Sequence, residues 1–303
     1  MASKSATCQF QFQAVSGFFI DFVEKARHDT SFRATTLPGL GLMDRTYETD
    51  VDKNSKDDQK LWKRFQDYVN YLNDQSAAST TYKVLYLTRH GLGFHNSFES
   101  EVGRDAWNSY WSHLDGDGKV IWADSQLNAD GIKQAEALGR FWSDAVSNES
   151  ILLPGTLYTS PLARCLNTTR LAFARTFEEQ GVQFRPIVKE SLRELITDHT
   201  CDRRSTRSWI EENYPDYLIE PNFSEKDSLW TGEHWETRDE HTARKQAVLE
   251  DIFSTDENAF IGLTVHSYAI SAILRAVGLP EFRVREGSSI ALLVKGEKIE
   301  RND

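Results

Sequence analysis

The sequence is poor in cysteine, in long hydrophobic runs and in positive charge. Its three cysteines, Cys8, Cys165 and Cys201, lack the spacing of a metal motif, and so sparse and odd a count is typical of a reducing compartment. No apolar run approaches the length of a membrane-spanning helix, and residues 14–23 are too often interrupted by polar residues for a secretory signal. We therefore expect a cytoplasmic protein that does not bind membranes.

The charge balance also restricts the ligands. Lys and Arg number 35 against 46 Asp and Glu, which leaves a net charge of −11. Such a surface repels nucleic-acid phosphates, so no nucleic-acid partner is expected, and an anionic ligand needs a local basic pocket. The 303 residues are 39% hydrophobic and 12% aromatic, which is ample for a large core. We predict a single domain over residues 1–303.

The most informative stretch is a short apolar run, residues 84–88, that stops at Arg89, His90 and Gly91. The run is typical of a buried strand, and Gly91 allows a sharp turn and the close approach of a ligand to the backbone. Ligands of open α/β sheets bind at the carboxyl ends of the strands. The cation and the imidazole are therefore expected at a binding edge.

Two further strands are predicted to end at polar residues. Residues 156–160 lead into a helix that carries Arg164, and residues 259–265 end at His266. Arg164 and Arg89 would place two guanidinium groups at neighbouring strand ends. Two such forked cations converging on one point suit a tetrahedral phosphoryl group.

Together, these motifs resemble a known signature. Arg89-His90-Gly91, with Asn96 five residues past the glycine, is similar to the motif of the histidine phosphatase superfamily, in the branch of cofactor-dependent phosphoglycerate mutases and fructose-2,6-bisphosphatase. The resemblance covers residues 82–293. Within this branch the chain most resembles a group of fungal phosphomutase-like proteins, which also carry a long segment ahead of the motif.

The resemblance implies a three-layer α/β/α sandwich with a mostly parallel central sheet, to which we add one antiparallel edge strand. The catalytic core is expected at residues 82–294, and residues 1–80 as an N-terminal elaboration of the domain or, alternatively, an independent small module. Two aromatic-rich insertions, residues 97–124 and 205–236, are expected to cap the site as a lid or to form a homodimer contact.

The resemblance and the chemistry of the residue types assign the roles. Neutral His90 attacks phosphorus to form a phosphohistidine, while a hydrogen bond to a backbone carbonyl holds its other nitrogen. Glu194 follows a strand at residues 186–189 and is the implied general acid, with a raised pKa. The residues expected to hold the phosphate are Arg89, Asn96, Arg164, His266 and Ser267. We expect His266 to be cationic, and the mechanism calls for no metal or cofactor because these groups already neutralise the phosphate.

Two other groups of residues leave alternatives open. Arg203 and Arg204 could bind a second anionic group or order the loop that carries Glu194. His234, Glu236 and His241 lie close in sequence but lack the spacing of a zinc site.

The predicted function is that of a metal-independent phosphomonoesterase, which hydrolyses a small phosphorylated organic substrate through a phosphohistidine. A phosphomutase, which returns the phosphoryl group to the substrate, is the rival enzyme. A non-catalytic scaffold that binds a phosphorylated ligand is the rival outside catalysis, although the full set of reactive residues argues against it.

Overall fold

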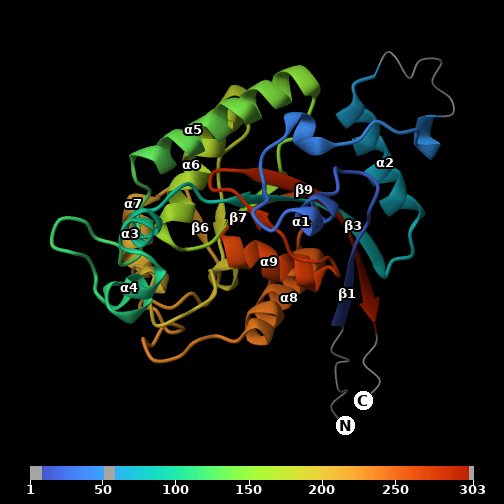
Figure 1. Ribbon diagram of the computed structural model, residues 1–303. Helices are drawn as coiled ribbons and strands as arrows, with labels where there is room; N and C mark the ends of the chain where they lie inside the picture. Colours follow the sequence, from blue (N-terminus) through green and yellow to red (C-terminus); the bar gives the residue numbers. More distant parts are fainter. Residues whose placement is uncertain (1–8, 51–58, 300–303) are drawn as a thin grey trace, which may run out of the picture.

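A computed structural model describes residues 9–50 and 59–299 of the protein (Figure 1). Cys8 lies outside the described residues. In the described part of the chain the central sheet has seven strands in the order β1-β9-β3-β7-β4-β5-β6. They are β1 (Gln9–Ala14), β9 (Ser289–Ile299), β3 (Thr80–Arg89), β7 (Phe260–Val265), β4 (Thr156–Thr159), β5 (Ile187–Val188) and β6 (Leu218–Ile219).

The sheet is mostly parallel, as predicted, but its one reversed strand is not at the edge. All neighbouring pairs from β3 to β6 are parallel, whereas β9 runs antiparallel to both β3 and β1. The expectation of an antiparallel edge strand was therefore wrong in position. The edge is β1, where Phe10 and Phe12 are buried and the glutamines between them face solvent.

Helices cover both faces of the sheet, which gives the predicted three-layer α/β/α sandwich (Figure 1). On β3, Leu85 and Leu87 pack on one face and Val84 and Tyr86 on the other, because successive side chains of a strand alternate. The first face is covered by α1 (Phe22–His28), α8 (Arg238–Thr255) and α9 (Ser267–Ala276). The second face is covered by α2 (Leu61–Gln75), α5 (Ala129–Asp144) and α6 (Ala163–Glu179).

Smaller elements lie around the carboxyl edge of the sheet. A two-stranded parallel ribbon joins β2 (Arg33–Ala34) to β8 (Arg283–Val284). The short helices are α3 (Phe94–Val102), α4 (Arg104–Ser109) and α7 (Arg207–Asn213). No helix among the described residues is both long and apolar enough to span a bilayer.

The aromatic residues of the 97–124 insertion form a packed cluster. Trp107 and Trp122 are buried, and Phe98 stacks on Trp122 with 4.5 Å between ring centroids. The cluster packs against buried Cys201, so it joins α3 and α4 to the segment that follows Glu194. Most of the aromatic side chains of this insertion therefore pack against one another beside the site.

Candidate active site

A cavity of about 430 Å³ opens at the carboxyl edge of the sheet, beyond the ends of β3 and β7. It gathers six of the residues that the sequence singled out. These are Arg89, His90, Asn96, Arg164, Glu194 and Ser267. The fold brings them together because parallel strands place their carboxyl ends at one edge.

His90 has the geometry of a nucleophile. Its Nδ1 lies 2.6 Å from the carbonyl oxygen of Gly91, and because a carbonyl can only accept, Nδ1 carries the proton and Nε2 keeps its lone pair. Burial, together with the charges of Arg164 and Arg89, lowers the pKa of His90 well below its usual value. His90 is therefore neutral, and the expected hydrogen bond to a backbone carbonyl is present.

Two buried guanidinium groups flank His90. Arg89 donates to the carbonyl of Val284 at 2.8 Å and pairs with Glu286 at 2.7 Å. Arg164 donates to the carbonyl of Cys201 at 2.8 Å and lies 3.8 Å from a carboxylate oxygen of Asp202. In each side chain the Nε–H has no partner among the described residues. Buried positive charge with unused donors is the environment that an anion requires.

Glu194 is held by the first turn of α9. Its Oε1 accepts the N–H of Ala269 at 2.8 Å, and its Oε2 accepts the N–H of Tyr268 at 3.0 Å. These bonds favour the carboxylate, but burial outweighs them and raises the pKa of Glu194. The raised pKa was expected, and burial is its main cause. A carboxyl group of this kind suits proton donation near neutral pH.

Asn96 and Ser267 line the cavity in supporting positions. The Oδ1 of Asn96 accepts the N–H of Gly93 at 3.2 Å in a capping interaction at the start of α3, which leaves its amide N–H groups as the donors for a ligand. The hydroxyl of Ser267 accepts a hydrogen bond from Arg283 at 3.0 Å.

The expectation for His266 needs correction. Its ring lies behind that of His90, with 5.0 Å between centroids, and it does not line the cavity. Its Nε2 is 2.7 Å from the hydroxyl of Ser160. Burial and the charge of Arg164 lower the pKa of His266 well below its usual value, so the ring is neutral and not a cation.

Arg203 and Arg204 also lie outside this cavity. Arg204 is buried, binds both carboxylate oxygens of Glu190 at 3.1 and 2.8 Å, and donates to carbonyls of the 205–236 insertion. Arg203 pairs with Asp115 at 2.8 Å and lies over the ring of Trp230. Of the two roles left open for these arginines, the structure favours ordering of the loop and not binding of a second anion at the site.

Sequence reasoning missed several residues of the cavity wall, among them Arg33, His95 and Arg283. His95 is only five residues from His90, and its buried Nδ1 has no partner among the described residues. Arg33 comes from the N-terminal elaboration and Arg283 from the segment after α9. No local motif marks either arginine, since only the pairing of β2 with β8 brings them together.

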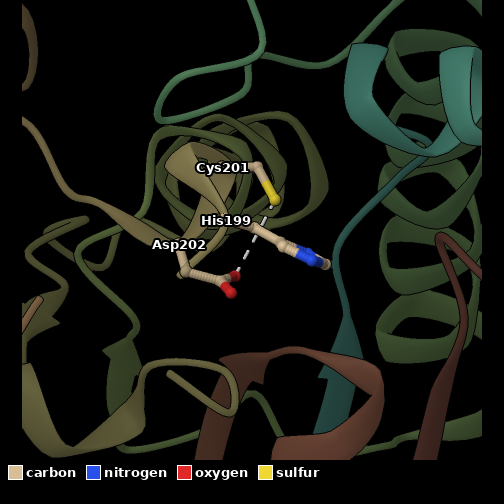
Figure 2. Close-up of side chains that lie close together, drawn as sticks. All are labelled: His199, Cys201 and Asp202. Atoms are coloured by element: carbon tan, nitrogen blue, oxygen red, sulfur yellow. Dashed lines mark hydrogen bonds between the residues drawn. The ribbon is translucent and has the colours of Figure 1, made fainter. Parts of the chain in front are cut away.

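One group of potential metal ligands occurs in the described residues, at His199, Cys201 and Asp202, whose ligand atoms lie within 4.8 Å of one another (Figure 2). The donor set does not fit a cation. Burial raises the pKa of the Cys201 thiol, which therefore keeps its proton, and the guanidinium of Arg164 lies beside Asp202. Figure 2 shows Asp202 beside the Cys201 sulfur, at 3.9 Å. We assign no metal to this group.

The three residues compared above with a zinc site, His234, Glu236 and His241, have other surroundings. Glu236 forms an ion pair with Arg244 at 2.6 Å, His241 is buried, and His234 is exposed near Glu240.

A pocket with a neutral histidine, two buried arginines and a protonatable glutamate defines a protein that handles phosphoryl groups. A model of the histidine phosphatase superfamily (branch 1) matches residues 85–286. The chain belongs to this superfamily, as its motifs indicated.

The names of curated relatives agree with this superfamily. A protein of Arthroderma benhamiae named "Probable phosphoglycerate mutase" is 44% identical over 86% of this chain and 77% of its own length. A protein of Saccharomyces cerevisiae with a similar name is 32% identical over 71% of this chain and 79% of its own length. The predicted resemblance to fungal phosphomutase-like proteins is confirmed.

Solved structures are more distant. The α-ribazole phosphatase of Shigella flexneri is 19% identical, with a TM-score of 0.42 over 69% of this chain and 89% of that one. A mycobacterial glucosyl-3-phosphoglycerate phosphatase is 20% identical, with a TM-score of 0.37 over 64% of this chain and 79% of that one.

Proposed function

We propose that the protein is a metal-independent phosphomonoesterase that hydrolyses a small phosphorylated metabolite through a phosphohistidine at His90. The observation that carries the proposal is the hydrogen bond from His90 Nδ1 to the Gly91 carbonyl, which leaves Nε2 as an unprotonated nucleophile between Arg89 and Arg164. An imidazole prepared in this way splits phosphoryl transfer into two easier steps.

In the first step, Nε2 of His90 attacks phosphorus, and an N–P bond forms as the P–O bond to the leaving alcohol breaks. The leaving oxygen takes a proton from Glu194, whose pKa burial raises in the direction that a general acid requires. In the second step, water attacks phosphorus, the N–P bond breaks, and the Glu194 carboxylate takes a proton from the water. The products are the alcohol and inorganic phosphate.

The guanidinium groups of Arg89 and Arg164 stabilise the negative charge on the phosphoryl oxygens. Arg164 is fully buried and Arg89 nearly so, and their buried Nε–H groups have no partner in the described part of the chain. Fixed cations at a largely buried position stabilise developing charge more than they would in water. These two groups are the reason to propose chemistry without a metal.

A phosphomutase is the second candidate, because the fungal relatives carry that name. It would use the same phosphohistidine but return the phosphoryl group to the substrate in place of water. The two candidates therefore differ in the acceptor and not in the nucleophile.

The test is phosphate release by the full chain from a panel of phosphorylated metabolites and p-nitrophenyl phosphate, with EDTA present. His90→Ala is the test variant, and His28→Ala, which removes an exposed imidazole on α1, is its matched control. EDTA-resistant release that His90→Ala abolishes and His28→Ala preserves supports the proposal. Release that survives in His90→Ala refutes the phosphohistidine.

A second assay separates hydrolase from mutase. Interconversion of 2- and 3-phosphoglycerate, primed by 2,3-bisphosphoglycerate and without release of phosphate, would establish the mutase in place of the phosphatase.

A further inference from the structure

The arginines that line the cavity fall into two groups. Three have a carboxylate partner: Arg89 with Glu286 at 2.7 Å, Arg104 with Glu99 at 2.9 Å, and Arg164 with Asp202 at 3.8 Å. The other two, Arg33 and Arg283, form no ion pair with any described residue. In a chain with a net charge of −11, these two guanidinium groups leave positive charge in the cavity that no described carboxylate neutralises by a direct ion pair.

The fold places these two arginines side by side. Arg33 of β2 and Arg283 of β8 are partners in the register of the parallel ribbon, so their side chains emerge as neighbours. Like charges in such positions repel each other and destabilise the pairing. An anion between them would relieve this repulsion.

Both guanidinium groups are also held in position. Arg283 donates to the hydroxyl of Ser267 at 3.0 Å, and its guanidinium carbon lies 3.9 Å from the centroid of the Tyr268 ring. Arg33 donates to the carbonyls of Thr30 and Phe32 at 3.3 and 2.8 Å. Groups that are already ordered lose less conformational entropy when they bind a ligand.

The pair lies close to the reaction centre but differs from it in exposure. Arg164 is buried and the side chain of Arg89 is 11% exposed, whereas Arg283 is half-buried and Arg33 is exposed. Burial lowers the pKa of Arg89, and the charges of Arg283 and Arg33 act in the same direction, which is consistent with their place near the inner arginine. The cavity thus has an inner and an outer positive region, and its volume of about 430 Å³ suits a small molecule that spans both.

We propose that Arg33 and Arg283 form a second anion site at the mouth of the cavity, and that the substrate carries a second anionic group besides the phosphoryl group transferred to His90. The second group is a phosphate or a carboxylate. This inference rests on the proposed function, since it concerns the substrate class of the same cavity. It also gives the N-terminal elaboration a direct part in specificity through Arg33.

The test uses substrate pairs that differ only in the second anion. Glycerol 3-phosphate and 3-phosphoglycerate differ by a carboxylate, and fructose 6-phosphate and fructose 1,6-bisphosphate differ by a phosphate. The variants are Arg33→Gln and Arg283→Gln in the full chain. The control is Arg185→Gln, an exposed arginine that precedes β5 at the opposite edge of the sheet and changes the net charge equally.

We expect each variant to lower kcat/KM about tenfold, mainly through KM, for the doubly anionic member of the favoured pair, the loss typical of a hydrogen bond to a charged group. The singly anionic member and p-nitrophenyl phosphate should lose less than the doubly anionic member, and the Arg185→Gln control should change less than about twofold on every substrate. The pair that shows the effect identifies the second group as carboxylate or phosphate. Equal losses on both members of each pair, or no loss on any, would overturn the proposal.

A binding measurement keeps this test separate from turnover. Calorimetric titration of His90→Ala with both members of each pair, with and without Arg33→Gln, measures the outer site in a protein that cannot react. Absence of phosphate release from wild type refutes the proposed function, whereas equal affinities within both pairs in His90→Ala, or a difference that Arg33→Gln leaves unchanged, refutes the second anion site.

Discussion

Replacement of Glu194 by glutamine tests the proton donor and the way that the fold holds it. Glutamine has nearly the shape of glutamate but cannot donate a proton to a leaving alkoxide. General acids contribute about 10²- to 10⁴-fold to rate, so phosphates of aliphatic alcohols should lose about that factor in kcat, or about 3–5 kcal/mol of transition-state stabilisation. p-Nitrophenyl phosphate, whose leaving group needs little protonation, should lose less than about tenfold.

The structure also sets the cost to stability. The carboxylate accepts the backbone N–H groups of Tyr268, Ala269 and Leu195, and glutamine keeps one accepting oxygen. The amide nitrogen is best placed toward Tyr268, which is exposed, so that water can satisfy the freed N–H. We expect a loss of about 1 kcal/mol in the free energy of unfolding, at the lower end of the cost of an unpaired donor.

The assay compares kcat for glycerol 3-phosphate and p-nitrophenyl phosphate in wild type, Glu194→Gln and the surface control Glu233→Gln, with urea unfolding of all three. Equal losses on the two substrates would remove Glu194 from the acid role. A loss of several kcal/mol in stability would show that the carboxylate chiefly anchors α9 and that its effect on rate is indirect.

Three further predictions concern stability and backbone geometry. Burial lowers the pKa of His241. Below about pH 6.5 the unfolded chain therefore binds a proton at this residue that the folded chain does not. As the pH falls further, the free energy of unfolding decreases by about 1.4 kcal/mol per pH unit because of this residue. His241→Gln should flatten the dependence of the unfolding free energy on pH between 5 and 6 by about 1 kcal/mol, measured by urea titration, and an unchanged slope would contradict this account. In Gly91→Ala the new Cβ would lie 2.4 Å from the carbonyl oxygen of Gly131, so the backbone beside the nucleophile must shift, and kcat should fall at least about tenfold; full activity would show that the turn can adjust. Trp107→Ala removes a buried ring of the aromatic cluster and should lower the free energy of unfolding by about 3–5 kcal/mol in urea, whereas a loss below about 1 kcal/mol would mean that the cluster contributes little to stability.

Much of the inner site could be predicted because its signals are local in sequence. An apolar run that stops at Arg89 and His90 specifies both the strand and the residues at its end. Asn128 is of a residue type that commonly caps helices, and it accepts the N–H of Gly131 at 2.8 Å at the start of α5. Such features depend on a few consecutive residues, which hydrophobic periodicity and capping rules describe directly.

The features that were missed depend on contacts between distant parts of the chain. Arg33 and Arg283 meet only through the β2–β8 ribbon, and β9 lies inside the sheet only because β1 pairs with its outer side. The protonation of His266 was misjudged for a related reason. Burial behind His90 decides its pKa, and burial is a property of the assembled fold.

The place of β9 in the sheet has a consequence for the order of folding. β1 precedes every other described strand in the sequence, yet its partner in the sheet is β9, in register from Gln9 with Ile299 to Ala14 with Val294. Phe10 and Phe12 therefore have no strand to join until the ribosome has produced β9. Pairing across such a separation in sequence closes a very long loop, which slows folding, and the apolar side chains of β1 stay available to chaperones or to other chains during this time.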